Sequence, residues 1–91
     1  MVVWNARRTT AIVIRHDGHN VRLVPMRSGR LVVHRTTRSC FDKEWLPSET
    51  PLNHALATFI EHAHTQGATA EVLKGLETLA HRDDPVVAPL F

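Results

Sequence analysis

The side chains best suited to chemistry in this chain are arginines that fall within a predicted β-sheet. One face of that sheet would carry four polar residues among valines and a methionine: Arg15, Arg22, Arg30 and His34. Arginine presents a planar fork of N–H donors that matches phosphate oxygens and the edge of guanine. Three further arginines lie near the strand ends, where they would add contacts to phosphates: Arg7, Arg8 and Arg27. These seven residues form the candidate binding surface.

The charge of the chain is divided between its two halves. Residues 1–41 hold eight arginines and one acid, Asp17, whereas residues 42–91 hold three cations and eight acids. The formal charges of the two halves are therefore +7 and −5, which the net charge of +2 conceals. A concentrated basic half is typical of a protein whose partner carries negative charge.

Length and composition indicate one small domain over residues 1–91. Hydrophobic residues make up 43% of the chain and charged residues 22%, which is typical of a globular protein. No apolar run approaches the roughly 18 residues that a membrane helix needs, and the first residues lack the pattern of a signal peptide. Cys40 is the single cysteine and cannot form an internal disulfide. We therefore expect a cytoplasmic protein that does not associate with a membrane.

The first 41 residues predict an antiparallel sheet of three or four strands. Three runs rich in β-branched residues, separated by turn signals, span residues 9–16, 19–26 and 31–37. The short run Val2-Val3-Trp4 would add a fourth strand. Consecutive strands joined by short turns are typical of a β-meander.

The strand register follows from the expected turns. A two-residue turn at Asp17-Gly18 would place Ile14 opposite Val21. The second turn could be a two-residue loop, or a three-residue loop with Gly29 in the left-handed conformation. We prefer the longer loop, because it moves Pro25 to a position that needs no backbone N–H. The apolar face would then carry Ile12, Ile14, Val21, Leu23, Pro25, Leu31 and Val33.

The second half predicts an acidic helical hairpin, residues 50–82, after a linking loop at 42–49. Thr50-Pro51 is typical of a helix start, Gly67 of a helix end and Thr69 of a second start. Gly75 would mark a close approach between the two helices. Two antiparallel helices on the apolar face of the sheet give a two-layer α+β fold. The apolar segment 83–91 forms a C-terminal tail, whose docking place the sequence leaves open.

The seven histidines and the one cysteine are residue types that can bind a metal or act in catalysis, but their spacing argues against both. His62 and His64 lie two residues apart on a predicted helix and point in different directions. His16 and His19 flank a tight turn, where they could hold only an open and weak metal site. No base or orienting group can be placed beside Cys40. We therefore expect no catalytic residue, no metal and no cofactor.

These observations favour a small, non-enzymatic accessory protein of bacterial or phage type that binds nucleic acid through its arginine face. The same face could instead contact an acidic protein surface, or the acidic helical half of a second copy in a homodimer. A third alternative is a solvated face whose arginine stems cover valines. Because the face lacks aromatic residues, it is not typical of a base-stacking platform for single strands.

Overall fold

The structure is a computed structural model that describes residues 1–82. Its elements are β1 (Val2–Asn5), β2 (Thr10–His16), β3 (Asn20–Pro25), β4 (His34–Thr37), α1 (Arg38–Glu44), β5 (Trp45–Pro47), α2 (Leu52–Gln66) and α3 (Ala70–Arg82). The predicted α+β class, and the order of a sheet followed by two helices, are confirmed. The predicted tail, 83–91, lies outside the described residues. None of the described helices has the length and apolar character needed to cross a membrane.

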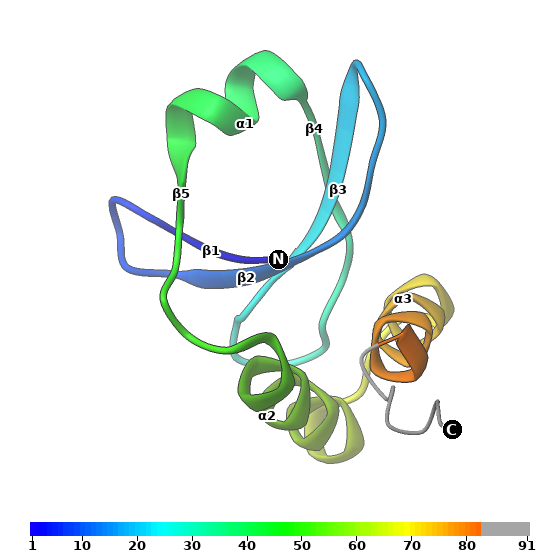
Figure 1. The fold of residues 1–91 in the computed structure, drawn as a ribbon. Helices are drawn as coiled ribbons and strands as arrows, with labels where there is room; N and C mark the ends of the chain where they lie inside the picture. Colours follow the sequence, from blue (N-terminus) through cyan, green and yellow to red (C-terminus); the bar gives the residue numbers. More distant parts are fainter. Residues whose placement is uncertain (83–91) are drawn as a thin grey trace, which may run out of the picture.

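The sheet has five antiparallel strands in the order β4-β3-β2-β1-β5. Strands β1 to β4 follow one another as hairpins, and the chain then crosses through α1 so that β5 pairs with β1 at the other edge. Figure 1 shows the sheet curling strongly, with α1 bridging the space between β4 and β5. The segment predicted as a linking loop therefore holds the end of α1 and the whole of β5. Thr37 begins α1, because its Oγ1 accepts the N–H of Cys40 at 3.2 Å.

Both faces of the sheet are covered by apolar side chains. Between the sheet and the α2–α3 pair, the first core cluster contains Val2, Ile12, Val24, Leu31, Ala55, Leu56, Phe59, Ala63, Val72, Leu76 and Leu79. On the opposite face, toward α1, the second cluster contains Val3, Ala11, Val13, Val21, Leu23, Phe41 and Trp45. The prediction of a single apolar face is therefore wrong, because Phe41 and Trp45 cover the face that holds Val13.

The predicted register between β2 and β3 is also wrong. Ile12 pairs with Val24 and His16 with Val21, and the pairing shifts at a β-bulge between Val13 and Arg15. The connection between β2 and β3 has three residues, 17–19, rather than two, and Oδ1 of Asp17 accepts the N–H groups of His19 and Asn20 at 2.8 and 2.7 Å. Such side-chain acceptance is the usual way in which aspartate organises a turn.

The third predicted strand, residues 31–37, is shorter in the structure. β4 begins only at His34, which pairs with Leu23. Leu31 lies before it and forms an isolated parallel bridge with Ala68, at the connection between α2 and α3. Gly29 has a φ of +86°, so the expected left-handed glycine is present. This loop thus fastens the helical hairpin to the sheet.

The helical hairpin begins and ends close to the predicted residues. Pro51 occupies the N-cap of α2, one residue later than expected, and Gly67 ends the helix with a φ of +89°. Thr69 precedes α3, and its Oγ1 accepts the N–H of Val72 at 3.4 Å. A Cβ on Gly75 would lie 2.9 Å from Cδ1 of Ile14. Gly75 therefore marks a close approach of α3 to strand β2, not to the other helix as predicted.

Candidate nucleic-acid interface

Three arginines lie side by side across neighbouring strands of the sheet. Arg15 on β2 pairs with Arg22 on β3, and Arg22 pairs in turn with Arg35 on β4. Neighbouring strands are about 4.8 Å apart, so the three residues form one continuous row, which we name the arginine row. The bulge after Val13 creates this alignment, because it brings Arg15 rather than Ile14 opposite Arg22.

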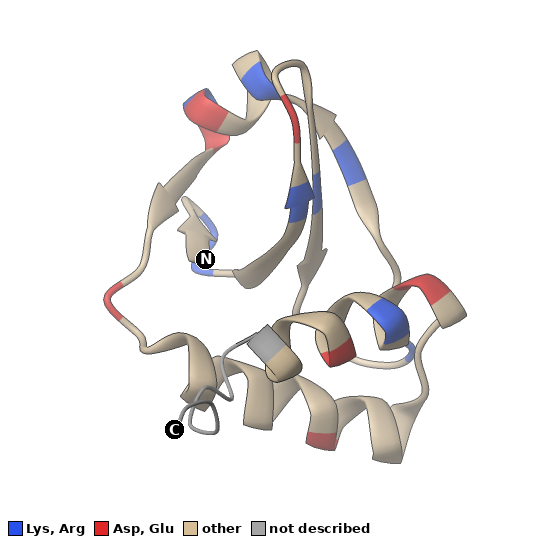
Figure 2. Cartoon of the chain, turned by 45° about the vertical axis from the view of Figure 1, so that its right-hand side comes forward, with Lys and Arg blue, Asp and Glu red and all other residues tan. Residues whose placement is uncertain are grey.

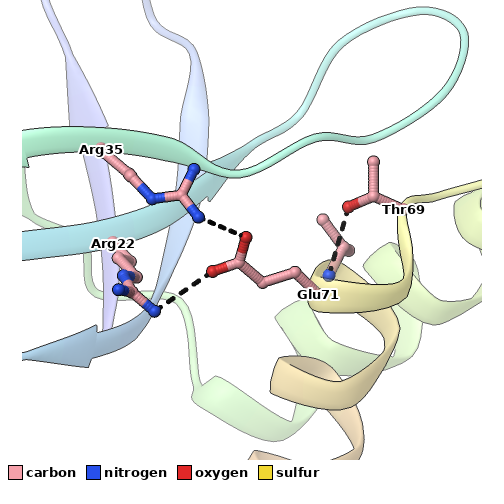
Figure 3. Close-up of polar contacts among 5 residues, drawn as sticks. Arg22, Arg35, Thr69 and Glu71 are labelled. Carbon is pink, nitrogen blue, oxygen red and sulfur yellow. Dashed lines mark hydrogen bonds and ion pairs between the residues drawn. The ribbon is translucent and has the colours of Figure 1, made fainter.

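One carboxylate contacts two members of the arginine row. Oε2 of Glu71 lies 3.3 Å from Nη1 of Arg22, and Oε1 lies 2.7 Å from Nη2 of Arg35. Figure 3 shows this carboxylate reaching from the start of α3 toward the two strands. Glu71 can reach the row because Thr69 begins the helix two residues earlier. Among residues 1–82, Arg15 has no ion-pair partner. The three arginines of the row and the carboxylate of Glu71 have a combined formal charge of +2.

The arginine row borders a cavity of about 300 Å³ at the β2–β3 turn. Its lining also includes His16, Asp17, Asn20 and Val21. The backbone N–H groups of Asn20 and His19 hold the pKa of Asp17 below its ordinary value. Two hydrogen bonds within the turn thus engage this carboxylate, and the three arginines supply most of the N–H donors in the lining of the cavity.

The structure separates the other residues of the predicted surface. His34 pairs with Leu23, whose neighbours Arg22 and Val24 belong to the opposite face, so His34 does not join the row. Arg30 lies near the α2–α3 connection, where its Cγ would be 3.8 Å from a Cβ on Gly67. Arg27 lies in the loop between β3 and β4, and Arg7 and Arg8 lie between β1 and β2. Of the seven candidates, only Arg15 and Arg22 are brought together.

Arg35 is the member of the row that the sequence reasoning missed. The predicted register placed His34 on the arginine face, and the true register exchanges the two residues. The row also lies on the same face of the sheet as α3, as its contact with Glu71 demonstrates. Figure 2 shows basic residues on the strands of the sheet, whereas α2 carries an acid and no cation. The five strands hold three arginines and no acid, whereas α3 holds two acids and two cations, so α2 and α3 together have a formal charge of −1.

The histidines have other positions. Nε2 of His62 on α2 lies 2.9 Å from the carbonyl oxygen of Gly29, a contact that holds the β3–β4 loop against the helix. Within the part of the chain that the structure describes, no three His, Cys, Asp or Glu side chains form a group able to hold a metal ion. Cys40 is exposed on α1. The chemistry that the site offers is hydrogen bonding by guanidinium groups.

Comparisons of the chain with protein-family models, with curated proteins and with solved structures found no match. Its function has to be argued from the arrangement of its own residues. Three adjacent guanidinium groups, each with five N–H donors in a fixed fork, can together donate to several phosphate oxygens. The carboxylate of Glu71 demonstrates this donor geometry, because it already accepts from two of the three.

Proposed function

We propose that this protein binds nucleic acid and that the arginine row contacts phosphates of its backbone. The observation that carries the proposal is the register of Arg15, Arg22 and Arg35 across three strands. Repulsion between like charges on opposite residues destabilises a sheet. Three cations side by side are therefore costly to the fold, and among residues 1–82 only one carboxylate, that of Glu71, forms ion pairs with them. A phosphate ligand would offset the remaining charge.

The charge of the first 41 residues supports the same proposal. Their formal charge of +7 attracts polyanions over a long range, and the row provides a specific place for contact. Further phosphate contacts would come from arginines in the surrounding loops: Arg7, Arg8, Arg27 and Arg30. The protein would act as a non-enzymatic accessory protein in the cytoplasm.

The proposal is tested by measuring the binding of labelled single- and double-stranded oligonucleotides to the wild type and to Arg15→Gln. Arg15 is the best position, because it is exposed and has no ion pair among the described residues, so its removal leaves the fold intact. Lys43→Gln removes the same charge from the end of α1 that is farther from β4, which makes it the matched control. We expect Arg15→Gln alone to weaken binding. Equal affinities for all three proteins, or no binding at low salt, would contradict the proposal.

A second candidate function is self-association, which one apolar feature of the helical layer favours. A groove of about 530 Å³ between α2 and α3 is lined by Ile60, Ala63, Leu73 and Leu76, and Leu73 is 49% exposed. Burial of such a leucine would stabilise a homodimer. Light scattering of the wild type and of Leu73→Glu tests this candidate. A wild-type dimer that the substitution dissociates would support it, and a monomer at all concentrations would contradict it.

A further inference from the structure

The two tryptophans of the chain have different environments. Trp45 is 7% exposed in the second core cluster, whereas Trp4 on β1 is 38% exposed. The indole Nε1 of Trp4 donates a hydrogen bond to the carbonyl oxygen of Pro47 at 3.2 Å. The polar edge of this ring is therefore fixed by β5, while much of its surface remains accessible.

Trp4 lines a groove of about 750 Å³ between the sheet and the segment that leads into α2. The groove combines one aromatic ring, one cation, three hydroxyl groups and one carboxylate, from Trp4, Arg8, Thr10, Ser48, Thr50 and Glu49. A mainly apolar groove would suit a peptide helix or a second copy of the chain. This mixture of groups instead suits a ligand that has both a flat heterocycle and an anionic group.

Arg8 stands in this groove in an unfavourable backbone conformation. Its φ is +62°, and among residues 1–82 it is the only non-glycine residue with a positive φ. The surrounding turn enforces this conformation: Oδ1 of Asn5 accepts the N–H groups of Arg7 and Thr9, each at 3.0 Å, and the N–H of Arg8 donates to the carbonyl oxygen of Asn5 at 2.8 Å. Glycine adopts such a φ without strain, so an arginine at this position points to a use for its side chain.

We propose that this groove binds an unpaired nucleotide of a single-stranded nucleic acid, with the base stacked on Trp4 and the phosphate held by Arg8. The inference rests on the proposed function and makes it more specific. In a duplex the faces of the bases are covered by their neighbours, so a base can stack on an indole only where it is unpaired. Glu49 can accept a hydrogen bond from an N–H group on the edge of the base, such as N3–H of thymine.

The expectation that the arginine face is not a base-stacking platform concerns that face alone. The cavity beside the arginine row has no aromatic residue. Trp4 provides an aromatic ring toward the opposite edge of the sheet, where β1 pairs with β5. The row and the groove are separate sites on the chain, lined by different residues. A single-stranded nucleic acid that contacts both sites would place its phosphates on the arginine row and one base in the groove.

The test is the intrinsic fluorescence of the wild type during titration with unlabelled oligothymidylate, since stacking on a base quenches tryptophan emission. Trp45 is buried and supplies a constant background. We expect quenching by the single strand but little by a duplex of the same length. Trp4→Ala should weaken single-strand binding by about 5- to 150-fold, the range of one base–aromatic stack, and Trp4→Phe should retain most of the affinity. Leu73→Ala is the matched control, because Leu73 is an exposed apolar residue on α3 that does not line the groove.

The outcomes distinguish this inference from the proposed function. Single-strand binding that depends on Arg15, but neither quenches Trp4 nor responds to Trp4→Ala, would overturn the stacking site and leave the function intact. Equal quenching by single strand and duplex would also overturn it. Absence of all nucleic-acid binding would overturn both. If Trp4→Ala fails to fold, Arg8→Gln replaces it, and an unchanged affinity for oligothymidylate would then contradict the phosphate contact.

Discussion

Nη2 of Arg35 lies 2.7 Å from Oε1 of Glu71, the shortest of the three ion pairs among residues 1–82. The two residues are 36 positions apart in the sequence, and their contact joins the edge strand β4 to the start of α3. The carboxylate of Glu71 also contacts Arg22, so it occupies the place that a phosphate oxygen would take in the arginine row. Glu71 therefore links the two layers and, in the proposed function, would compete with a phosphate of the ligand.

The first prediction is that Glu71→Gln strengthens nucleic-acid binding. The neutral amide releases Arg22 and Arg35 from a charged partner, and both are then free to contact phosphate. Exposed ion pairs are worth about 0.2–1 kcal/mol each, and Glu71 forms two of them, so we expect a gain in affinity of roughly 2- to 30-fold and a loss of stability of about 0.4–2 kcal/mol. Binding titrations and urea unfolding measure the two effects. Unchanged or weaker binding would show that Glu71 does not compete with the ligand.

The second prediction concerns the close approach of α3 to β2. A Cβ added by Gly75→Ala would lie 2.9 Å from Cδ1 of Ile14 and 3.1 Å from its Cβ and Cγ2. Overpacking costs about 1–3 kcal/mol, and alanine's higher helix propensity returns about 1 kcal/mol. We expect a net loss in the free energy of unfolding of about 1 kcal/mol. Gly18→Ala is the control, because a Cβ there meets no atom within 4 Å. A stabilised Gly75→Ala variant would disprove this packing.

The third prediction separates the strain at Arg8 from the function of its side chain. Arg8→Gly removes the cost of a positive φ, about 1–2 kcal/mol, but adds unfolded-state entropy, so we expect a net stabilisation of about 0.5–1 kcal/mol. Arg8→Ala keeps the strain and should leave stability nearly unchanged. Both variants lose the cation and should weaken oligothymidylate binding equally. Thermal unfolding together with fluorescence titration checks the prediction, and a glycine variant less stable than the alanine variant would refute it.

The fourth prediction is a pH dependence that arises from the β2–β3 turn. Hydrogen bonds from the backbone N–H groups of Asn20 and His19 lower the pKa of Asp17 in the folded protein. The unfolded chain then binds the proton more readily, so this contribution to stability is complete above the ordinary pKa of 3.8 and is lost as the pH falls through the folded pKa. Urea unfolding below about pH 4 should show this loss in the wild type and not in Asp17→Asn. An Asp17 carboxyl that titrates at its ordinary pKa in NMR spectra would contradict the assignment.

Local signals predicted much of the fold. Gly67 and Thr69 mark the end of α2 and the start of α3 because their conformation and hydrogen bonds involve only nearby residues. Strands β2, β3 and β4 were predictable because runs of β-branched residues and turn signals are also local features. α1 was missed although Thr37 caps it, because the segment was interpreted through Trp45 and Pro47 as a loop. The pairing of β5 with β1 depends on a crossing between distant strands, which no local pattern specifies.

The candidate site was predictable only in part. Arg15 and Arg22 were expected on one face and do lie next to each other, although the expected register was wrong. The turn at Asp17 and the bulge at Ile14 both shift the pairing between β2 and β3, and together they place Arg15 opposite Arg22. Arg35 replaces His34 for a separate reason, because the pairing between β3 and β4 is shifted by one residue from the predicted one. Glu71 lies in another layer, and its contact with the arginine row follows only from the packing of α3 on the sheet.

The most direct test of the central claim is the salt dependence of nucleic-acid binding by the wild type and by Arg15→Gln. Each phosphate contact contributes about 0.7–0.9 to the slope of log K against log salt concentration. If the arginine row contacts phosphates, the slope for Arg15→Gln is smaller by about that amount, whereas the Lys43→Gln control keeps the slope of the wild type. Identical slopes for the wild type and Arg15→Gln would contradict the claim that the arginine row is the phosphate-binding surface of this protein.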